Sequence, residues 1–470
     1  EVGEEPKGGA WGPDGTILFV PTVERYLHKV SASGGPVTPV TKVDQASGQT
    51  SHRWPWFLPD GRHFIYFSRS NRDDTEGLYV GSLDSQETKF LFSTKCRGAY
   101  VPAADGGAGG YLLFLRDRAL LAQAFDADKL QLSGEPFTVA EDVLNYPTNV
   151  GPTGYATFSV SANGHLSYLP GVALATQLVW FDRAGKDLGP LRVDGTYTEQ
   201  QLSPDGKRIV ATRGDAAGRD LWMIDIARRT PTRFTFDSAT ELSPVWSPQG
   251  DTVVFASNRT GIHFLYKKSS RMGGDDVPLS TTERDAYPDD WSKDGRFILF
   301  EQISPETKFD IWILELTAEQ MPLRPPSVFL RTNFDESHAQ FSPDGRFVAY
   351  VSNESGRAEV YVQNFPGQED KWQISTDGGD QPQWRRDGKE LFYIAADKTL
   401  MAVPVSTGDA FERGAPVALF KTRVPLTTIS TEKNYYLVTA DGQRFLVSQL
   451  DDRNTQPITV VLNWAANLKR

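Results

Sequence analysis

The sequence contains a single cysteine, Cys96, so no disulfide within the chain can hold the fold together. No apolar run approaches the length of a membrane-spanning helix, and the residues after Glu1 do not resemble a signal peptide. The six histidines are scattered singly, with no pair at metal-ligand spacing. A net charge of −11 disfavours nucleic acid as a partner and favours cations or basic peptides.

Catalytic motifs are absent as well. There is no glycine-rich phosphate loop, no Gly-x-x-x-x-Gly-Lys-Ser/Thr segment and no His-Arg-Asp loop, so we expect no phosphoryl transfer. No Gly-x-Ser-x-Gly sequence is present to form the nucleophile elbow of a hydrolase. We therefore expect a chain that is not an enzyme and uses no cofactor.

What the sequence does contain is a repeat. A phrase built around Ser-Pro-Asp-Gly recurs about ten times, each time followed by a short apolar run. The clearest copies begin at Ser203, Ser247, Ser292 and Ser342. Successive motif glycines lie 42 to 58 residues apart, mostly 43 to 46, which is the period of four-stranded propeller blades. The repeat predicts an all-β propeller of about ten four-stranded repeats.

Each repeat can be interpreted as four short strands. The first strand ends in a large aromatic residue (Trp246, Trp291, Phe341 or Trp384), and we expect these rings to pack between blades. The Asp-Gly pair supplies the positive backbone dihedral of a tight hairpin. One carboxylate per turn, such as Asp294, is too few for calcium, so a turn-forming role is expected.

A longer period suggests two propeller-like regions. The segment at Gly134-Glu135-Pro136 is echoed by Gly414-Ala415-Pro416, 280 residues or six repeats later. We expect residues 196–470 to form a six-bladed propeller and residues 1–195 to form four repeats of a second, incomplete unit. The alternative is a single ring of ten blades. An open four-blade fragment would expose two apolar flanks, which favours either that single ring or further blades upstream.

The repeats resemble the TolB-type, WD-like propeller repeats of bacteria over nearly the whole chain. More specific strings begin at Ser51 (SHRWP), Tyr79 (YVGSLD), Gln177 (QLVWFDR) and Pro457 (PITVVLNW). These strings resemble the propeller region that follows the membrane span in bacterial serine/threonine kinases of the PknB-like group, particularly from acidobacteria. The resemblance implies a sensing or docking region outside the cytoplasm, with phosphoryl transfer done elsewhere. It also implies that Glu1 is not a natural start and that the complete protein has six plus six blades.

We therefore expect a ligand-sensing or protein-interaction propeller, periplasmic or extracellular, tethered by an upstream membrane span. One alternative is a stand-alone periplasmic TolB-like scaffold, and another is the non-catalytic propeller of a prolyl oligopeptidase-type hydrolase. An upstream membrane span with a kinase domain would support the hypothesis of a tethered sensor. A signal peptide would support the stand-alone scaffold, and a downstream nucleophile elbow the propeller of a hydrolase.

Acidic residues recur just before the turn motif in five consecutive repeats, where the first strand of a blade enters the central channel. The candidate ligand-binding residues at this channel mouth are Glu199, Glu241, Asp285, Asp289, Glu336, His338 and Asp380. Crowded carboxylates have raised pKa values unless a cation compensates them. The pattern predicts a mouth that accepts a basic peptide or a cation. The alternative is a hydrated polar channel whose acids face water.

A second candidate site lies at the start of another first strand. The segment there contains His52, Arg53, Trp54 and Trp56, two basic groups and two indoles. Such a set is able to form a pocket for an aromatic or glycan ligand. The alternative is ordinary packing between blades.

Overall fold

The computed structural model shows an all-β chain. It describes residues 7–21, 26–70, 72–103, 109–144, 155–161, 163–170, 176–215, 218–271, 273–280, 284–304, 307–367, 370–408, 410–425, 433–450 and 457–464. In these ranges the strands form ten antiparallel sheets, and one short 3-10 helix, η1 (Gln45–Ser47), is the helical exception. No helix among the described residues is long and apolar enough to span a bilayer. The predicted all-β fold of about ten four-stranded repeats is confirmed.

The chain divides into two compact units. Unit 1 comprises Glu1–Leu174 and Arg453–Arg470, and unit 2 comprises Ala175–Asp452. This boundary differs from the one expected after residue 195. The difference arises because strands that precede residue 195 pair with strands near the end of unit 2, as described below.

Unit 2 contains six sheets, which we number as blades one to six in chain order of their first strands. Blades one to three are β17 (Thr198–Leu202), β18 (Arg208–Asp215), β19 (Gly218–Asp225) and β20 (Thr230–Arg233); β21 (Glu241–Trp246), β22 (Thr252–Ser257), β23 (Phe264–Ser269) and β24 (Val277–Pro278); and β25 (Ala286–Trp291), β26 (Phe297–Ser304), β27 (Lys308–Glu315) and β28 (Ser327–Leu330).

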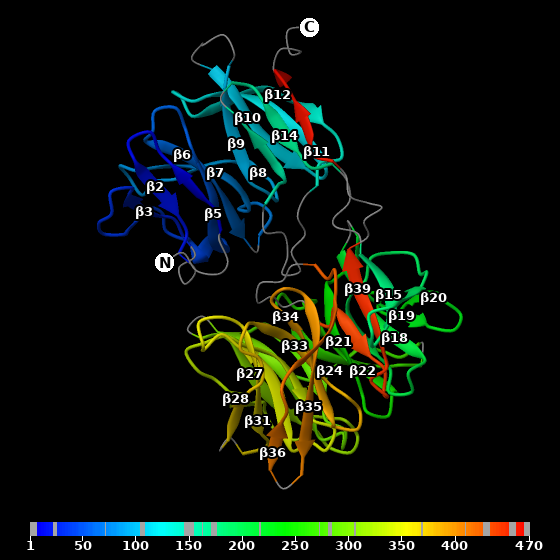
Figure 1. Ribbon diagram of the computed structural model, residues 1–470. Coiled ribbons are helices and arrows are strands. Elements are labelled where there is room, and N and C mark those ends of the chain that lie inside the picture. Colours follow the sequence, from blue (N-terminus) through cyan, green and yellow to red (C-terminus); the bar gives the residue numbers. More distant parts are fainter. Residues whose placement is uncertain are drawn as a thin grey trace. The chain divides into compact units, whose positions relative to one another are not determined.

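Blades four and five are β29 (Glu336–Phe341), β30 (Phe347–Ser352), β31 (Glu359–Asn364) and β32 (Lys371–Gln373); and β33 (Gly379–Trp384), β34 (Glu390–Ala395), β35 (Thr399–Thr407), β36 (Phe411–Arg413) and β37 (Val417–Lys421). Blade six joins β38 (Tyr436–Val438) and β39 (Arg444–Leu450) to β15 (Thr176–Asp182) and β16 (Asp187–Pro190). Figure 1 shows β39 beside β15 despite their separation in sequence.

The split sixth blade closes unit 2 into a ring. Residues Thr176 to Asp182 of β15 pair in continuous register with Leu450 to Arg444 of β39. Apolar clusters fill the space between every neighbouring pair of blades, including blades six and one, where Leu446 packs near Ile209. Unit 2 is therefore a closed six-bladed propeller, and the alternative of one ten-bladed ring is excluded.

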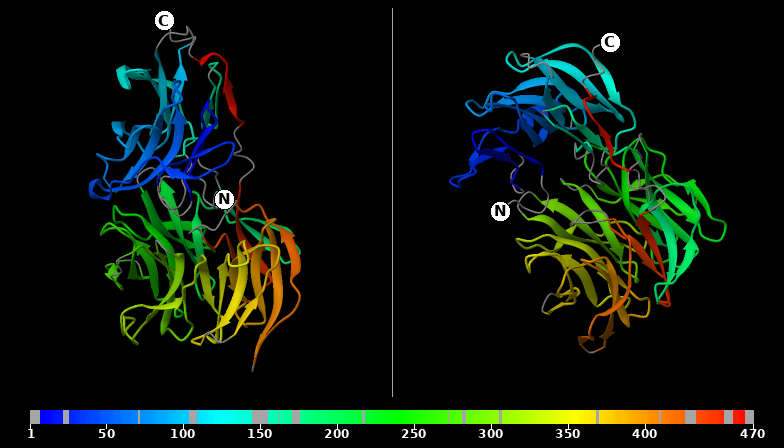
Figure 2. Two further views of the ribbon diagram at one scale, coloured as in Figure 1. Left: turned by 90° about the vertical axis from the view of Figure 1, so that its left-hand side faces the viewer. Right: turned by 45° about the horizontal axis from the view of Figure 1, so that its top comes forward.

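Unit 1 contains four sheets in its described residues. They are β1 (Gly9–Trp11), β2 (Thr16–Phe19), β3 (His28–Ser31) and β4 (Thr38–Pro39); β5 (Gln49–Phe57), β6 (His63–Ser70), β7 (Gly77–Ser82) and β8 (Lys89–Ser93); β9 (Gly98–Pro102), β10 (Gly109–Arg116), β11 (Ala119–Asp126) and β12 (Gln131–Ala140); and β13 (Phe158–Val160), β14 (Leu166–Tyr168) and β40 (Thr459–Val461). The last strand, β40, is red in Figure 2 among the blue and cyan strands of this unit.

The sheets of unit 1 form an open series. Three apolar clusters join successive sheets, and among the described residues none joins the first sheet to the fourth. Apolar side chains on the terminal sheets are accordingly exposed: Trp11 is 69% exposed and Val460 is 60% exposed.

The recurring turn has the geometry that its sequence predicts. In blade one, the amide of Gly206 donates to the carbonyl of Ser203 at 2.8 Å, and Gly206 has a φ of 71°. The hydroxyl of Ser203 donates to Asp205 Oδ1 at 2.6 Å. Aromatic residues before these turns are buried between blades, as expected; Trp246 is 5% exposed and its indole donates to the carbonyl of Gln201.

Candidate functional site

The inner strands of unit 2 carry a recurrent β-bulge near their starts. We call the first strand of each blade its inner strand, because these strands contact one another around the ring. The ladder register shifts between Thr198 and Gln201 in blade one and at the matching place in blades two to five. Residues in the left-handed region stand at these shifts: Glu199, Ser243, His338 and Gln381 have φ values of 51° to 55°. A bulge redirects side chains, and here it places polar groups in the channel.

Side chains of a neighbouring blade bind the amides at several bulges. Glu199 accepts hydrogen bonds from the backbone amide and hydroxyl of Ser243, both at 3.1 Å. Glu301, on β26, accepts from the amide of His338 at 2.6 Å. Gln381 accepts from the amide of Tyr435 at 2.7 Å. Buried amides need such partners, so part of the acidic recurrence serves the backbone.

An ion pair crosses the channel between opposite blades. Lys433 Nζ lies 2.5 Å from Asp289 Oδ1, and both side chains are almost fully buried. Lys433 stands three residues before β38 of blade six, whereas Asp289 is on β25 of blade three. Beside this pair, His338 Nδ1 lies 2.6 Å from Asp380 Oδ1. We define the channel cluster as Glu199, Gln200, Asp289, Glu301, His338, Asp380 and Lys433.

Burial and mutual charge shift the pKa values in this cluster. Burial raises the pKa of Asp289 well above its usual range, and the carboxylate of Glu301 adds to the shift. Burial alone would lower the pKa of Lys433, but Asp289 and Glu301 raise it, so the ammonium is the stable form. Burial likewise opposes protonation of His338, yet Asp380 raises its pKa to about 9. The channel thus holds two cations at neutral pH.

Several buried polar atoms of the channel cluster have no hydrogen-bond partner among the described residues. They are Asp289 Oδ2, Glu301 Oε2 and both amide atoms of Gln200. Gln200 is 0% exposed and stands three residues before Ser203, as Asp289 stands three residues before Ser292, so both occupy the same place in their blades. Unsatisfied buried polar atoms are costly. The cluster therefore has unused capacity for a hydrogen-bonding, positively charged group.

Three of the predicted mouth residues lie in other pairings. Glu241 accepts from the hydroxyl of Ser257 and forms an ion pair with Arg259, and burial raises its pKa to about 7. Asp285 Oδ1 lies 2.9 Å from His263 Nδ1. Glu336 accepts from Thr332, and burial raises its pKa to about 7. The channel cluster contains the other four predicted residues, Glu199, Asp289, His338 and Asp380.

The predicted aromatic pocket has a different arrangement. His52 is 1% exposed, with its ring nitrogens 2.8 Å from Thr41 Oγ1 and 3.1 Å from Gln49 Oε1. Arg53 donates to Ser51, and the indole of Trp56 donates to the carbonyl of Tyr100 in the next sheet. Trp54 lies in a bulge at φ 56°, with its ring 5.0 Å from that of Tyr155. These contacts are those of packing within and between blades.

Lys433, Glu301 and Gln200 were not predicted from the sequence. Glu301 is on the second strand of its blade, whereas the acidic pattern recurs on first strands, and Gln200 is uncharged. Lys433 could have been identified from the sequence. It is a basic residue six residues before Thr439, in the segment where the five preceding repeats carry acidic residues.

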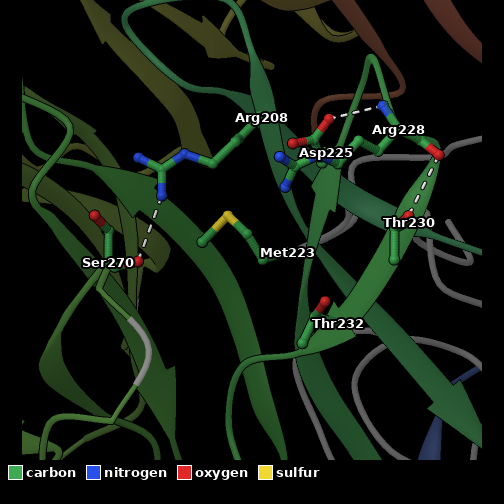
Figure 3. Close-up of a pocket in the computed structure, with 7 residues that line it drawn as sticks. All are labelled: Arg208, Met223, Asp225, Arg228, Thr230, Thr232 and Ser270. Carbon is green, nitrogen blue, oxygen red and sulfur yellow. Dashed lines mark hydrogen bonds between the residues drawn. The ribbon is translucent and has the colours of Figure 1, made fainter.

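A cavity of about 230 Å³ lies at another place in unit 2, between blades one and two. Figure 3 shows its lining, with Arg208 directed toward Ser270. The guanidinium donates to the carbonyls of Ser270 and Gly250 and lies 4.9 Å from the ring of Trp246. The cavity is smaller than typical ligand pockets, and the guanidinium of Arg208 that lines it already holds blades one and two together. We therefore place the candidate site in the channel.

One family model matches part of unit 2, and several solved structures are distantly similar to the chain. Residues 192–337 match the family model PD40, the TolB beta propeller domain. A protein described as a TolB from Agrobacterium tumefaciens is 15% identical, with 59% of this chain and 99% of that chain covered and a TM-score of 0.47. TolB from Acinetobacter baumannii is 16% identical, with 76% and 80% covered and a TM-score of 0.36.

The tricorn protease is also similar, at 10% identity, with 89% of this chain and 44% of that chain covered and a TM-score of 0.35. At these identities and TM-scores the solved structures carry no information on function. The family match covers blades one to three, with β29 of the fourth, and so lies within the closed ring. Unit 2 thus carries TolB-type propeller repeats.

Proposed function

We propose that the chain is a non-catalytic binding region whose unit 2 channel accepts a basic side chain from a peptide or protein partner. The observation that carries the proposal is the set of buried, unpartnered acceptors at Asp289, Glu301 and Gln200. Within the channel cluster, four carboxyl groups face two basic groups, so the balance is acidic. An ammonium offers three donors and a guanidinium five, which suits such acceptors.

The chemistry of the cluster favours an organic cation over a metal ion. Lys433 shows that an alkylammonium group fits between Asp289 and its neighbours. Within the described ranges, no group of three or more His, Cys, Asp or Glu side chains is arranged to hold a metal ion. A lysine or arginine side chain is accordingly the ligand group that we propose.

We further propose that this binding region is the extracytoplasmic sensor of a bacterial membrane serine/threonine kinase. The strings at Ser51, Tyr79, Gln177 and Pro457, which resemble the PknB-like group, support this assignment. Reading the gene upstream of Glu1 tests it. A membrane span preceded by kinase motifs would support the kinase, whereas a signal peptide directly upstream would overturn it in favour of a stand-alone periplasmic scaffold.

A pair of matched peptides tests the binding site. Acetyl-Gly-Lys-Gly-amide and its norleucine counterpart differ only in the ammonium group, and binding to the full chain can be followed by ligand-observed NMR. We expect the lysine peptide alone to bind, with an affinity that falls as salt is added. Glu301→Gln, which removes one channel charge, should weaken binding at least tenfold. Equal binding of the two peptides would contradict the proposal.

A further inference from the structure

The lysine that crosses the channel occupies the place at which a ligand cation would bind. Lys433 is 3% exposed and Asp289 is 1% exposed, so their ion pair is withdrawn from water. Because blades three and six are opposite in a six-bladed ring, the Lys433 side chain spans the channel axis. Entry of a second side chain along the axis requires that Lys433 leave.

The chain that follows Lys433 toward β38 is anchored to blade five. Asn434 accepts from Gln383 Nε2 at 3.4 Å, and the amide of Tyr435 donates to Gln381 at 2.7 Å. The hydroxyl of Tyr436 donates to the carbonyl of Gln381 at 2.9 Å. These bonds fix residues 434–436 to blade five. The Lys433 side chain can therefore exchange without loss of the strand that follows it.

In blades one, two, four and five, the position equivalent to that of Lys433 carries no basic residue. The residue directly before each left-handed bulge residue is Thr198 in blade one, Leu242 in blade two, Ser337 in blade four and Asp380 in blade five. In blade six the residue before Asn434, which has a φ of 62°, is Lys433. At this position the basic residue is found in blade six, which is assembled from both ends of unit 2, whereas the second cation of the channel, His338, is itself the bulge residue of blade four.

The energetics allow such an exchange. The desolvation cost of an ammonium that enters the channel is offset by the rehydration of the Lys433 ammonium that leaves it, so the exchange is close to neutral. The unpartnered atoms Asp289 Oδ2 and Glu301 Oε2 offer hydrogen bonds that Lys433 leaves unused. An incoming ammonium or guanidinium that also reaches them would gain these bonds.

We propose that Lys433 is an internal competitor for the cation subsite formed by Asp289, Glu301 and Gln200. The proposal rests on the proposed function, because it assumes that the channel binds a basic side chain. The ligand class is a lysine or arginine side chain of a partner, which displaces Lys433 from Asp289. In the free protein Lys433 fills the subsite. The affinity for a ligand then depends on how much more favourably the ligand cation binds there than Lys433 does.

Substitution of Lys433 tests the competition. Lys433→Met retains the length of the side chain and removes its charge, and Asp289, whose pKa burial raises, can take up a proton in its place. We expect Lys433→Met to bind acetyl-Gly-Lys-Gly-amide at least tenfold more tightly than the unmodified chain. Lys433→Arg, a stronger bidentate partner for a carboxylate, should bind it more weakly.

Lys268→Met is the matched control. Lys268 is 9% exposed and pairs with Asp276 at 2.6 Å, but it lies on β23, outside the channel. Lys268→Met changes the net charge of the chain as much as Lys433→Met does, so it controls for non-specific electrostatic attraction. Its affinity for the lysine peptide should equal that of the unmodified chain. If Lys433→Met binds no more tightly than Lys268→Met while the lysine peptide still binds, competition is overturned and the channel site stands. If no variant distinguishes the lysine peptide from the norleucine peptide, the proposed function fails as well.

Discussion

The two units are built from one repeat, yet in the part of the chain that the structure describes unit 2 forms a closed ring and unit 1 an open series of sheets. In unit 2 every blade packs on two neighbours, because β39 from one end of the segment pairs with β15 from the other. In unit 1 the described sheets make three such interfaces, and apolar groups such as Trp11 and Val460 remain exposed. Closure also brings charges from opposite blades together, as in the pair of Lys433 with Asp289. The same sequence motif therefore yields an open series of sheets in the described part of unit 1 and a ring with a charged interior in unit 2.

Loss of the buried partner should have the largest effect on this contrast. Asp289→Ala removes the carboxylate that pairs directly with the buried Lys433 and should destabilise unit 2 by about 3–5 kcal/mol. The matched change in unit 1, Asp84→Ala, breaks an exposed pair with Arg62 and should cost only about 0–1 kcal/mol. Urea denaturation followed by pulse-labelling hydrogen exchange measures each unit separately. Equal losses would show that the channel charges are not special.

Core truncation tests whether closure makes unit 2 cooperative. Leu446 on β39 and Leu166 on β14 are both 0% exposed. Changing either to alanine should cost about 2–5 kcal/mol. We expect Leu446→Ala to speed exchange in all six blades, since it weakens the closing interface. Leu166→Ala should release the sheet of β13, β14 and β40 alone. Release of a single blade in the Leu446 variant would contradict the closed-ring account.

The two units should respond to pH in opposite directions. The raised pKa of His338, about 9, gives unit 2 stability that is complete below pH 6.5 and is lost as pH rises toward 9. Burial lowers the pKa of His52 to about 4, so unit 1 has stability that is complete above pH 6.5 and is lost as pH falls toward 4. Urea midpoints of each unit across this range measure both trends. His338→Gln should flatten the first and His52→Gln the second.

Turn glycines should show the smallest difference. Gly295 has a φ of 81° with no atom closer than 3.9 Å to an added Cβ, so Gly295→Val tests backbone strain and not a clash. We expect a loss of roughly 1 kcal/mol in unit 2. Gly15, at φ 85°, is the equivalent in the first sheet of unit 1, and Gly15→Val should cost a similar amount. The thermal unfolding midpoints of the two variants measure these losses. An unchanged midpoint in both variants would show that the two glycines do not occupy the turn positions assigned to them.

The fold was largely predictable from the sequence, because the turn phrase and the apolar run after it are local signals. The closing partner of β39 was not, since the pairing of Thr176 with Leu450 joins residues that share no local pattern. The acidic residues were also identified, but their grouping was not. Glu199, Glu241 and Asp289 stand four, six and three residues before their motif serines, and the bulge between these places sends them in different directions. A bulge adds one residue to a strand and has no clear sequence signature. The spacing of residues alone therefore does not predict the direction in which their side chains point.

The antiparallel pairing of β15 and β39 has a mechanical consequence. Thr176 and Leu450, where the chain enters and leaves unit 2, are paired at the same end of this ladder. Tension applied through those two points would load one hydrogen bond at a time, from Thr176 toward Asp182, instead of shearing the whole ladder together. Unit 2 would then open under low force by peeling its sixth blade, and that blade is the one that places Lys433 in the channel. Force applied at Thr176 and Leu450 would thus also displace the blade that carries Lys433 and so alter the channel site.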